Sequence, residues 1–396
     1  MKRKLLIVGI TMNAAGTEKS FLSFAENIDY SEWDVTLLLA RASGELMGCI
    51  PPQIKVEEMD GGELFLLDKT NAGSLILHNY IRKNPLRAFS VMRSCVEIAL
   101  SRGDKRVYAK NRLWLKAMEA LPAHRGRYDL ALAYWGDRTM FYTADKVNAE
   151  RRITWLHFDF GKPPREKALY GEYFGKFEKV VTVSESISRS LAEAIPSAAD
   201  KIVTAENIID AKKIIRLSQE DAGIRFTGTK LITVGRICEQ KGYDLALPAI
   251  ARLISEGIDL KWYIIGAGSG EYYDGFISDI KSMGLEGRVI LLGTTANPYK
   301  YMRACDVYVQ PSRHEGKPIA VEEAKVLELP IFATEYSSAK EQLRGYRAVT
   351  GEISEEGIYS GIKAAIALSG DDPRGNAPSQ NVGKEDFSSA VKRILE

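Results

Sequence analysis

Short apolar runs alternate with stretches of helical periodicity through almost the whole chain, a pattern typical of parallel sheets wrapped by helices. In the first half, the runs that predict strands are residues 5–10, 35–39, 130–134, 153–157 and 180–184. In the second half, they are residues 231–234, 262–265, 289–292, 307–310 and 331–333. Helices are expected at residues 16–28, 185–195 and 243–256, among others. Each half therefore predicts a doubly wound domain of the α/β class.

The length of the chain and a break in this rhythm indicate two domains. A chain of 396 residues exceeds what one hydrophobic core usually supports. Between residues 207 and 225 the strand pattern gives way to a polar connector, and a loop at 370–383 precedes a last helix at 385–395. We expect an N-terminal domain at 1–207, a C-terminal domain at 208–383, and a C-terminal helix at 384–396 that can return to the N-terminal domain.

Composition and charge exclude several classes of protein. A net charge of +2 gives no reason to expect a nucleic-acid partner. The cysteines Cys49, Cys95, Cys238 and Cys305 have no paired spacing, so neither zinc nor a disulfide framework is expected, which fits a reducing cytoplasm. The apolar run near the N-terminus spans about six residues and predicts a strand rather than a signal peptide. Because no run approaches the roughly 20 residues of a membrane span, we expect contact with a membrane only from its surface.

Residues 82–127 concentrate positive charge. They contain twelve Lys and Arg residues against three acids, an excess of nine charges. Apolar residues, among them Trp114, are interleaved with these cations. Such a segment can lie on an anionic membrane surface with Trp114 and its apolar neighbours inserted. Alternatively, it is a solvated helical face that packs its apolar side on the N-terminal sheet.

The strongest functional signal is the segment from Pro311 to Lys325, which contains Glu315-Gly-Lys-Pro318 and Glu322-Glu323. A strand ends before it and a helix is expected to begin near Pro318, so free amides and the helix dipole predict an anion site. Glu323 shares its helix face with apolar residues, where a carboxylate is costly unless it has partners. The alternative is a helix rim from which Glu323 reaches solvent.

The second signal is Gly235-Arg236 at the end of a strand, followed by Lys241-Gly242 at the start of a helix. Two cations at this spacing suit a diphosphate, because arginine can form two hydrogen bonds to phosphate and lysine adds a point charge. The alternative is a pair of ordinary surface cations at loop ends.

Together, the two segments resemble the retaining glycosyltransferases of family four, which adopt the GT-B fold of two facing Rossmann-like domains with a deep cleft between them. Gly235-Arg236, Lys241-Gly242 and the pair Glu315 and Glu323 stand in that family's order and at similar spacing. Looser matches over the rest of the chain are Ala15-Gly16-Thr17-Glu18, Trp155-Leu-His157, Val183-Ser184, Asn207-Ile-Ile-Asp210, Asn297-Pro-Tyr-Lys-Tyr-Met and Asp306-Val-Tyr-Val-Gln-Pro-Ser. The chain departs from the family at Ala15, where the family has glycine, and at Lys317-Pro318, because Pro318 lacks an N–H.

The resemblance implies roles for ten residues, with His157, Glu315, Arg236 and Lys241 as the catalytic set. Arg236 and Lys241 would neutralise the diphosphate leaving group. Glu323 would bind the ribose hydroxyls, Glu315 the hydroxyls of the donor sugar, and His157 would lie near the reacting sugar and the acceptor. The remaining donor-binding positions are Gly16 and Gly235, where a small residue permits close approach, and the amides of Gly316, Lys317 and Ile319.

The resemblance also implies the reaction, which is transfer of a hexose-type sugar with retention of configuration by same-face attack. The donor would be a nucleotide-diphosphate sugar, expected to be UDP-linked, and the acceptor a glycan or a lipid-linked molecule bound by the N-terminal domain. No metal and no cofactor besides the donor are implied. The setting would be synthesis of cell-surface polysaccharide or glycolipid by a cytoplasmic protein peripheral to the inner face of the plasma membrane.

Two other functions fit parts of the sequence. The turn Gly266-Ala-Gly-Ser-Gly270 suggests the dinucleotide site of a nicotinamide-dependent dehydrogenase, but Glu271 stands where the third glycine of that motif belongs. A non-catalytic, glycosyltransferase-like partner subunit would be expected to lack the Glu, Arg and Lys set, which this chain retains.

Overall fold

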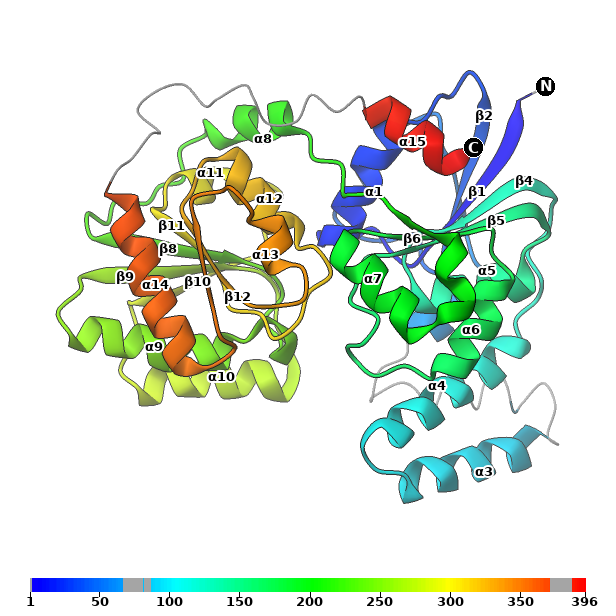
Figure 1. Ribbon diagram of the computed structural model, residues 1–396, viewed down its shortest axis with the longest axis horizontal. Helices are drawn as coiled ribbons and strands as arrows, with labels where there is room; N and C mark the ends of the chain where they lie inside the picture. Colours follow the sequence, from blue (N-terminus) through cyan, green and yellow to red (C-terminus); the bar gives the residue numbers. More distant parts are fainter. Residues whose placement is uncertain (1, 67–80, 82–86, 371–386) are drawn as a thin grey trace. The chain divides into compact units, whose positions relative to one another are not determined.

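The chain folds as two doubly wound α/β units, which confirms the predicted fold class (Figure 1). The computed structural model describes residues 2–66, 81, 87–370 and 387–396. The first unit comprises Met1–Asn13, Thr17–Glu206 and Phe387–Glu396. The second comprises Ala14–Gly16 and Asn207–Asp386.

The first unit is built on a parallel sheet of seven strands in the order β3-β2-β1-β4-β5-β6-β7. The strands are β1 (Arg3–Gly9), β2 (Trp33–Leu39), β3 (Lys55–Glu58), β4 (Tyr128–Ala133), β5 (Ala149–Leu156), β6 (Lys179–Thr182) and β7 (Ile202–Thr204). The α-helices that accompany it are α1 (Gly16–Glu26), α3 (Arg87–Leu100), α4 (Gly103–Glu119), α5 (Asp137–Lys146), α6 (Lys167–Gly175), α7 (Glu185–Ala194) and α15 (Phe387–Leu395). Short 3-10 helices are η1 (Met47–Cys49), η2 (Gly62–Leu66) and η4 (Pro196–Lys201).

The second unit is built on a parallel sheet of six strands in the order β10-β9-β8-β11-β12-β13. The strands are β8 (Thr229–Val234), β9 (Leu260–Ile265), β10 (Val289–Gly293), β11 (Val307–Gln310), β12 (Ile331–Thr334) and β13 (Ala348–Gly351). The helices are α8 (Ala211–Ser218), η5 (Glu239–Lys241), α9 (Tyr243–Ser255), α10 (Gly270–Ser282), α11 (Tyr299–Arg303), α12 (Ile319–Val326), α13 (Ala339–Gln342) and α14 (Glu355–Ser369).

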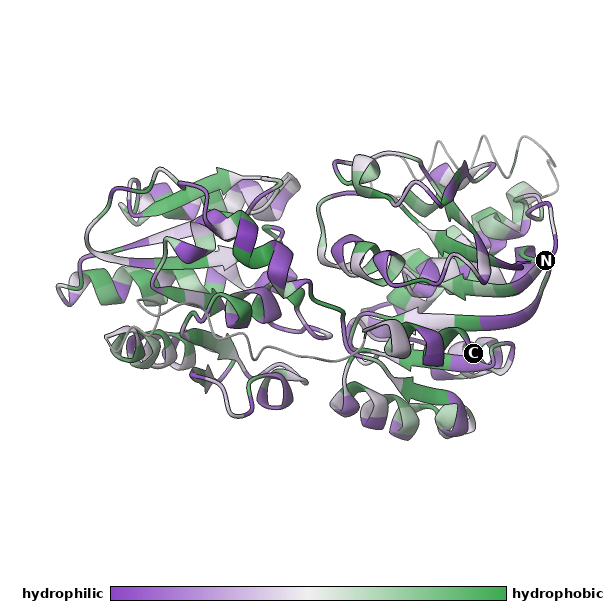
Figure 2. Cartoon of the chain, turned by 90° about the horizontal axis from the view of Figure 1, so that it is seen from above, coloured by the Kyte–Doolittle hydropathy of each residue, from purple (hydrophilic) through white to green (hydrophobic). Residues whose placement is uncertain are grey.

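The central strands form the cores because helices cover both faces of each sheet. In β1, Leu5 to Val8 are fully buried, as expected for a parallel strand with helices on both faces. Trp155 on β5 packs against Phe24 of α1, and Trp262 on β9 packs against Tyr243 of α9. Figure 2 shows hydrophobic residues concentrated in the central strands of both units.

The ten predicted strands are confirmed, with ends that shift by a few residues. Three short strands, β3, β7 and β13, were not predicted. All three are edge strands of their sheets. Their residues are mostly half-buried or exposed, so these strands contain no continuous apolar run. The polar connector at 207–225 contains helix α8, which Asp210 caps by accepting a hydrogen bond from the amide of Lys213 at 2.9 Å.

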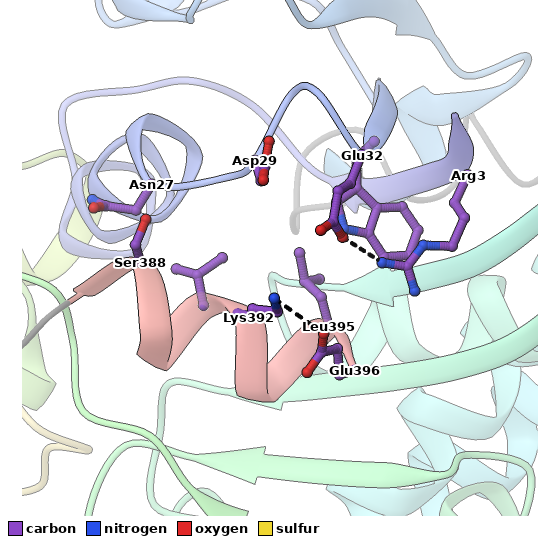
Figure 3. Close-up of a pocket in the computed structure, with 10 residues that line it drawn as sticks. Arg3, Asn27, Asp29, Glu32, Ser388, Lys392, Leu395 and Glu396 are labelled. Atoms are coloured by element: carbon purple, nitrogen blue, oxygen red, sulfur yellow. Dashed lines mark hydrogen bonds and ion pairs between the residues drawn. The ribbon is translucent and has the colours of Figure 1, made fainter. Parts of the chain in front are cut away.

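The C-terminal helix α15 packs in the first unit. Val391 and Leu395 are buried there, and two cations bind carbonyls in the last turn of the helix: Arg151 that of Leu395 at 3.1 Å, and Lys179 that of Arg393 at 3.0 Å. Cations at a helix C-terminus stabilise its exposed carbonyls. A cavity of about 100 Å³ lies beside the helix, lined among others by Asn27, Ser388 and Lys392 (Figure 3).

Candidate active site

In the second unit, the strand order reverses between β8 and β11. The chain goes outward from β8 to β9 and β10 and then returns to β11, which pairs with β8. Ligands of doubly wound sheets bind at the carboxyl ends of the strands at such a reversal. The two segments that the sequence singled out, 235–242 and 311–319, follow β8 and β11 at this point.

Backbone and side-chain hydrogen bonds hold these two loops against each other. The amide of Arg313 donates to the carbonyl of Gln240 at 2.8 Å, and the side-chain amide of Gln240 donates to the carbonyl of His314 at 3.0 Å. Gly242 has φ 67°, and a Cβ there would lie 2.1 Å from the carbonyl oxygen of Pro311. Glycine is thus required at Gly242 by the backbone conformation and by the close approach of the second loop.

A salt bridge that the sequence did not predict joins the same loops. The guanidinium of Arg313 donates to both carboxylate oxygens of Asp244 at 2.7 and 2.6 Å, and the hydroxyl of Tyr272 donates to Asp244 at 2.6 Å. Burial raises the pKa of Asp244, but the hydrogen bonds from Arg313 and Tyr272 outweigh burial and lower the pKa below its usual value of 3.8. Asp244 therefore stays ionised and fixes the loop that leads to Glu315.

The carboxylate of Glu315 is almost fully buried, with 6% of the residue exposed. Its Oε1 accepts three hydrogen bonds: from Lys241 Nζ at 2.7 Å, from Ser312 Oγ at 2.6 Å and from Gln310 Nε2 at 2.9 Å. Gln310 is held in turn by the hydroxyl of Tyr308, which donates to its Oε1 at 2.6 Å. Within the described residues, Oε2 of Glu315 accepts no hydrogen bond, so one oxygen is fixed by the protein while the other can accept from a ligand hydroxyl.

Arg236 contrasts with Lys241. Its side chain is exposed and forms no ion pair or hydrogen bond within the part of the chain that the structure describes. Gly235 lies beside Lys241, since a Cβ at Gly235 would be 3.2 Å from Lys241 Cε. The end of β8 therefore presents one uncommitted cation and one that is paired with Glu315.

The loop before α12 leaves backbone donors available. Side chains of the second unit bind four consecutive carbonyls: Ser337 binds that of Glu315 at 3.3 Å, Ser338 that of Gly316, Asn207 that of Lys317 at 3.1 Å and Gln342 that of Pro318 at 3.0 Å. In a trans peptide the N–H of the next residue points away from the carbonyl. Among the described residues, the amides of Gly316 and Ile319 donate to no protein acceptor, and Pro318 precedes the helix in an extended conformation. These amides and the N-terminus of α12 are suited to bind an anion.

Glu323 on α12 is 2% exposed, which excludes the alternative in which it reaches solvent from a helix rim. The hydroxyl of Tyr299, on α11, donates to its Oε1 at 2.8 Å. Burial and the negative charge of Glu323 raise the pKa of Tyr299. The neighbouring Glu322 instead pairs with Lys325 at 2.9 Å, as its more polar helix face predicts.

The remaining predicted site residues, Gly16 and His157, follow β1 and β5 in the chain. His157 directly follows β5, and its ring stacks on Trp155 with centroids 5.5 Å apart and lies 4.7 Å from the ring of Tyr134. Gly16 is the first residue of α1, and the short segment Ala14–Gly16 groups with the second unit. The second unit thus brings eight predicted residues together: Gly235, Arg236, Lys241, Glu315, Gly316, Lys317, Ile319 and Glu323. Their roles stay predictions.

The glycine-rich turn after β9 has a structural explanation. A Cβ at Gly266 would lie 2.0 Å from the carbonyl oxygen of Gly235, and one at Gly268 would lie 2.1 Å from the ring of Tyr273. Both glycines permit tight packing around the end of β8, so the turn gives no support to a dinucleotide site.

The structure corrects one part of the expectation for residues 82–127. Trp114 is buried in the core of the first unit, where its indole donates to the carbonyl of Leu64 at 2.8 Å, so the prediction that it inserts into a membrane is wrong. Arg112 pairs with Glu97 at 3.1 Å and with Glu166, which commits this cation to the protein. The apolar side of α4 packs against the core of the first unit, as the alternative interpretation predicts.

The described residues contain neither a candidate metal cluster nor a candidate membrane span. Within these ranges, no group of three or more His, Cys, Asp or Glu side chains is placed to hold a metal ion. No helix among them is long and apolar enough to cross a membrane.

Comparisons with known proteins agree with this description. Residues 216–381 match the family model described as glycosyl transferases group 1. A Campylobacter jejuni N-acetylgalactosaminyltransferase that acts on a diphospho-undecaprenol acceptor is 27% identical over 203 residues, which are 50% of this chain and 54% of the relative. The lipopolysaccharide core mannosyltransferase LpsB of Rhizobium meliloti is 30% identical over 177 residues, 43% of this chain and 48% of the relative. The alignments thus span about half of the length of these relatives.

Solved structures are similar over the full chain. HepE of Anabaena, crystallised with UDP and glucose, has a TM-score of 0.65 and 16% identity and covers 99% of this chain and 94% of its own. WaaG, a glycosyltransferase of lipopolysaccharide biosynthesis, has a TM-score of 0.57 and 13% identity, with 99% and 98% coverage. The fold is therefore that of the GT-B glycosyltransferases. Within this fold, the chain is similar to the group 1 glycosyltransferases over residues 216–381, which lie in the second unit.

Proposed function

We propose that the protein transfers a hexose-type sugar from a UDP-linked donor, with retention of configuration, to a glycan or lipid-linked acceptor. One observation carries the proposal: the switch point of the second sheet combines an uncommitted Arg236, the Lys241–Glu315 pair and two unbonded amides at the start of α12. A nucleoside diphosphate needs such a group of positive donors. The UDP complex of HepE and the diphospho-undecaprenol acceptor of the Campylobacter relative support the classes of donor and acceptor.

Different residues of the second unit bind different parts of the donor. Arg236, Lys241 and the amides of Gly316 and Ile319 bind the diphosphate and stabilise the charge that it gains as the bond to the sugar breaks. Lys317 contributes its amide, and Gly235 leaves room for the side chain of Lys241. Glu323 accepts from the ribose hydroxyls, which is consistent with a buried carboxylate that Tyr299 already orients.

Three further residues have proposed roles toward the sugar and the acceptor. Glu315 offers its Oε2 to a sugar hydroxyl, because Oε1 is fully engaged. The acceptor hydroxyl attacks the anomeric carbon on the face from which UDP departs, with His157 near the reacting atoms and Gly16 permitting close approach to the diphosphate. The setting that we propose is cell-surface polysaccharide or glycolipid synthesis by a cytoplasmic protein at the inner face of the membrane.

A panel of nucleotide sugars tests this function. A bound ligand raises the melting temperature by mass action, so UDP and one UDP-sugar should stabilise the wild type, and Arg236→Ala should remove most of that shift. NMR of the product formed from that donor should show the anomeric configuration of the donor. If no nucleotide sugar shifts the melting temperature, or if the product is inverted, the proposal fails.

A further inference from the structure

Helix α3 of the first unit exposes a stripe of large apolar side chains. Phe89 is 71% exposed, Met92 58%, Val96 52% and Leu100 79%. Successive members are three or four residues apart, so all four lie on one face of the helix. They are half of the eight large hydrophobic residues that are exposed in the described part of the chain. We name these four residues the α3 stripe.

The opposite side of α3 packs against α4 and the core of the first unit. Ser94 is buried and accepts a hydrogen bond from Lys116 of α4 at 2.9 Å, and Glu97 pairs with Arg112 of α4 at 3.1 Å. Val91 packs against the core of the unit. Helix α3 lies beyond α4, away from the seven-stranded sheet (Figure 1). The helix therefore attaches through a partly polar face and turns its most apolar face to solvent, the reverse of a helix whose apolar face serves the core.

The surroundings of the α3 stripe are basic. Arg93 is exposed on α3, Arg102 is exposed directly before α4, and Lys105, Arg106 and Lys110 are exposed in the first half of α4. Of the nearby acids, Glu97 is already paired with Arg112, and Asp104 is exposed beside Lys105. An apolar ridge with basic flanks is the pattern of a helix that lies in the interface of an anionic bilayer.

Charge decides between two occupants of this surface. A second copy of the chain that covered the stripe with its own stripe would bring the same cations of α3 and α4 together, and like charges repel. An anionic bilayer accepts the apolar side chains between its headgroups and neutralises the cations at the same time. Contiguous exposed apolar side chains often mark interaction sites, and the four residues of the α3 stripe lie together on one helix face.

We propose that α3 is a membrane-docking helix that inserts Phe89, Met92, Val96 and Leu100 into the headgroup region of an anionic bilayer, with Arg93, Lys105 and Arg106 at the lipid phosphates. The proposal specifies the peripheral location given above, but it depends on no residue of the donor site. Docking confines the protein to the surface that holds any lipid-linked acceptor. It also replaces Trp114 as the source of salt-resistant binding, because Trp114 is buried.

Co-sedimentation with phosphatidylglycerol-containing vesicles, and with phosphatidylcholine vesicles as a reference, tests the proposal on the full chain. The double variant Phe89→Ser/Leu100→Ser should bind anionic vesicles at least about tenfold more weakly than the wild type at both low and high salt. The triple variant Arg93→Gln/Lys105→Gln/Arg106→Gln should lose up to about fivefold per cation at low salt and little at high salt. Met283→Ser/Ile353→Ser removes two apolar residues that are 40% and 37% exposed in the second unit, and it should bind like the wild type.

Folding and donor binding are measured on the same variants. Circular dichroism and the UDP-induced shift in melting temperature should be unchanged in the Phe89→Ser/Leu100→Ser variant, so failure of the docking proposal and failure of the donor site are separable. Equal vesicle binding by this variant and the wild type, or no binding of the wild type to anionic vesicles, would overturn the proposal. So would wild-type self-association in sedimentation velocity that the double variant abolishes, because the α3 stripe would then be an interface between copies.

Discussion

Lys241 and Glu315 join the ends of two adjacent strands: Nζ of Lys241 lies 2.7 Å from Oε1 of Glu315, and both side chains are mostly buried. The lysine therefore neutralises the carboxylate before any donor is bound. A buried carboxylate that loses its cation is costly, so Lys241 has a structural as well as a proposed catalytic role. Arg236, which is exposed and unpaired in the described residues, has only the second.

This difference predicts two distinct phenotypes. Arg236→Ala should lower turnover of the UDP-sugar by at least about a hundredfold and leave the free energy of unfolding within about 0.5 kcal/mol of wild type. Lys241→Ala should lower turnover to a similar extent and should also destabilise the protein, by about 3 kcal/mol. Lys281→Ala on α10 is the control, because Lys281 is exposed and its side chain forms no hydrogen bond or ion pair in the described residues. Steady-state kinetics and urea unfolding distinguish the cases, and wild-type rates in Arg236→Ala would place the diphosphate elsewhere.

Glu323→Ala should weaken UDP binding at least about tenfold, because the ribose hydroxyls lose a charged acceptor. The same change removes the 2.8 Å hydrogen bond from the hydroxyl of Tyr299 to Glu323 Oε1. Loss of this buried hydrogen bond should lower the free energy of unfolding by about 1–3 kcal/mol. Tyr299→Phe removes that hydrogen bond but keeps the carboxylate. Titration calorimetry should therefore show weak UDP binding in Glu323→Ala and near-normal binding in Tyr299→Phe. Unchanged UDP affinity in Glu323→Ala would assign Glu323 to structure alone.

The side chains that fix Glu315 should affect the sugar more than the nucleotide. Ser312→Ala and Gln310→Met each remove one hydrogen bond to Oε1. Each should lower kcat/KM for the UDP-sugar at least about tenfold, because a misplaced Glu315 carboxylate no longer orients the sugar. The affinity for UDP itself should change less than about threefold, since the diphosphate contacts are intact. Equal losses of UDP and UDP-sugar affinity would show that these residues support the loop as a whole.

The Arg313–Asp244 pair predicts a dependence of stability on pH. Because the pKa of Asp244 is lowered in the folded state, the unfolded state binds the proton first as the pH falls. The stabilisation is complete above about pH 5 and is lost as the pH falls through about 4 and below. Asp244→Asn, which cannot ionise, should show a smaller loss of stability between about pH 5 and pH 3 than wild type. Asp274→Asn, at an exposed position on α10, should follow the wild type, and an Asp244→Asn curve parallel to that of wild type would contradict the account.

Metal removal should have little effect on activity. The proposed site stabilises the leaving diphosphate with two cations and with helix amides, which supply the charge that a metal would otherwise provide. Turnover in EDTA should stay within about twofold of the untreated enzyme. Complete loss in EDTA that magnesium or manganese restores would show that these protein groups are insufficient.

The parts of the fold that could be predicted from the sequence are those in which burial is continuous. Central strands such as β1 and β11 are buried on both faces and are therefore visible as apolar runs, whereas the edge strands β3 and β13 are not. The positions of Arg236 and Glu315 at adjacent strand ends followed from motif order and from the rule that parallel strands end at one edge of a sheet.

Other parts depend on contacts that leave no local pattern. The Arg313–Asp244 pair joins residues 69 positions apart, and no periodicity relates them. Periodicity showed that residues 82–127 contain amphipathic helices, but it did not show which side of each helix faces the protein. The structure resolves this oppositely for the two helices, since α4 buries Trp114 while α3 exposes Phe89.

The most direct test of the central claim is a structure of the protein with UDP bound. We expect phosphate oxygens within hydrogen-bonding distance of Arg236, Lys241 and the amides of Gly316 and Ile319, with a ribose hydroxyl on Glu323. A diphosphate bound at any other place in the second unit, or a ribose that leaves Glu323 with Tyr299 as before, would contradict it.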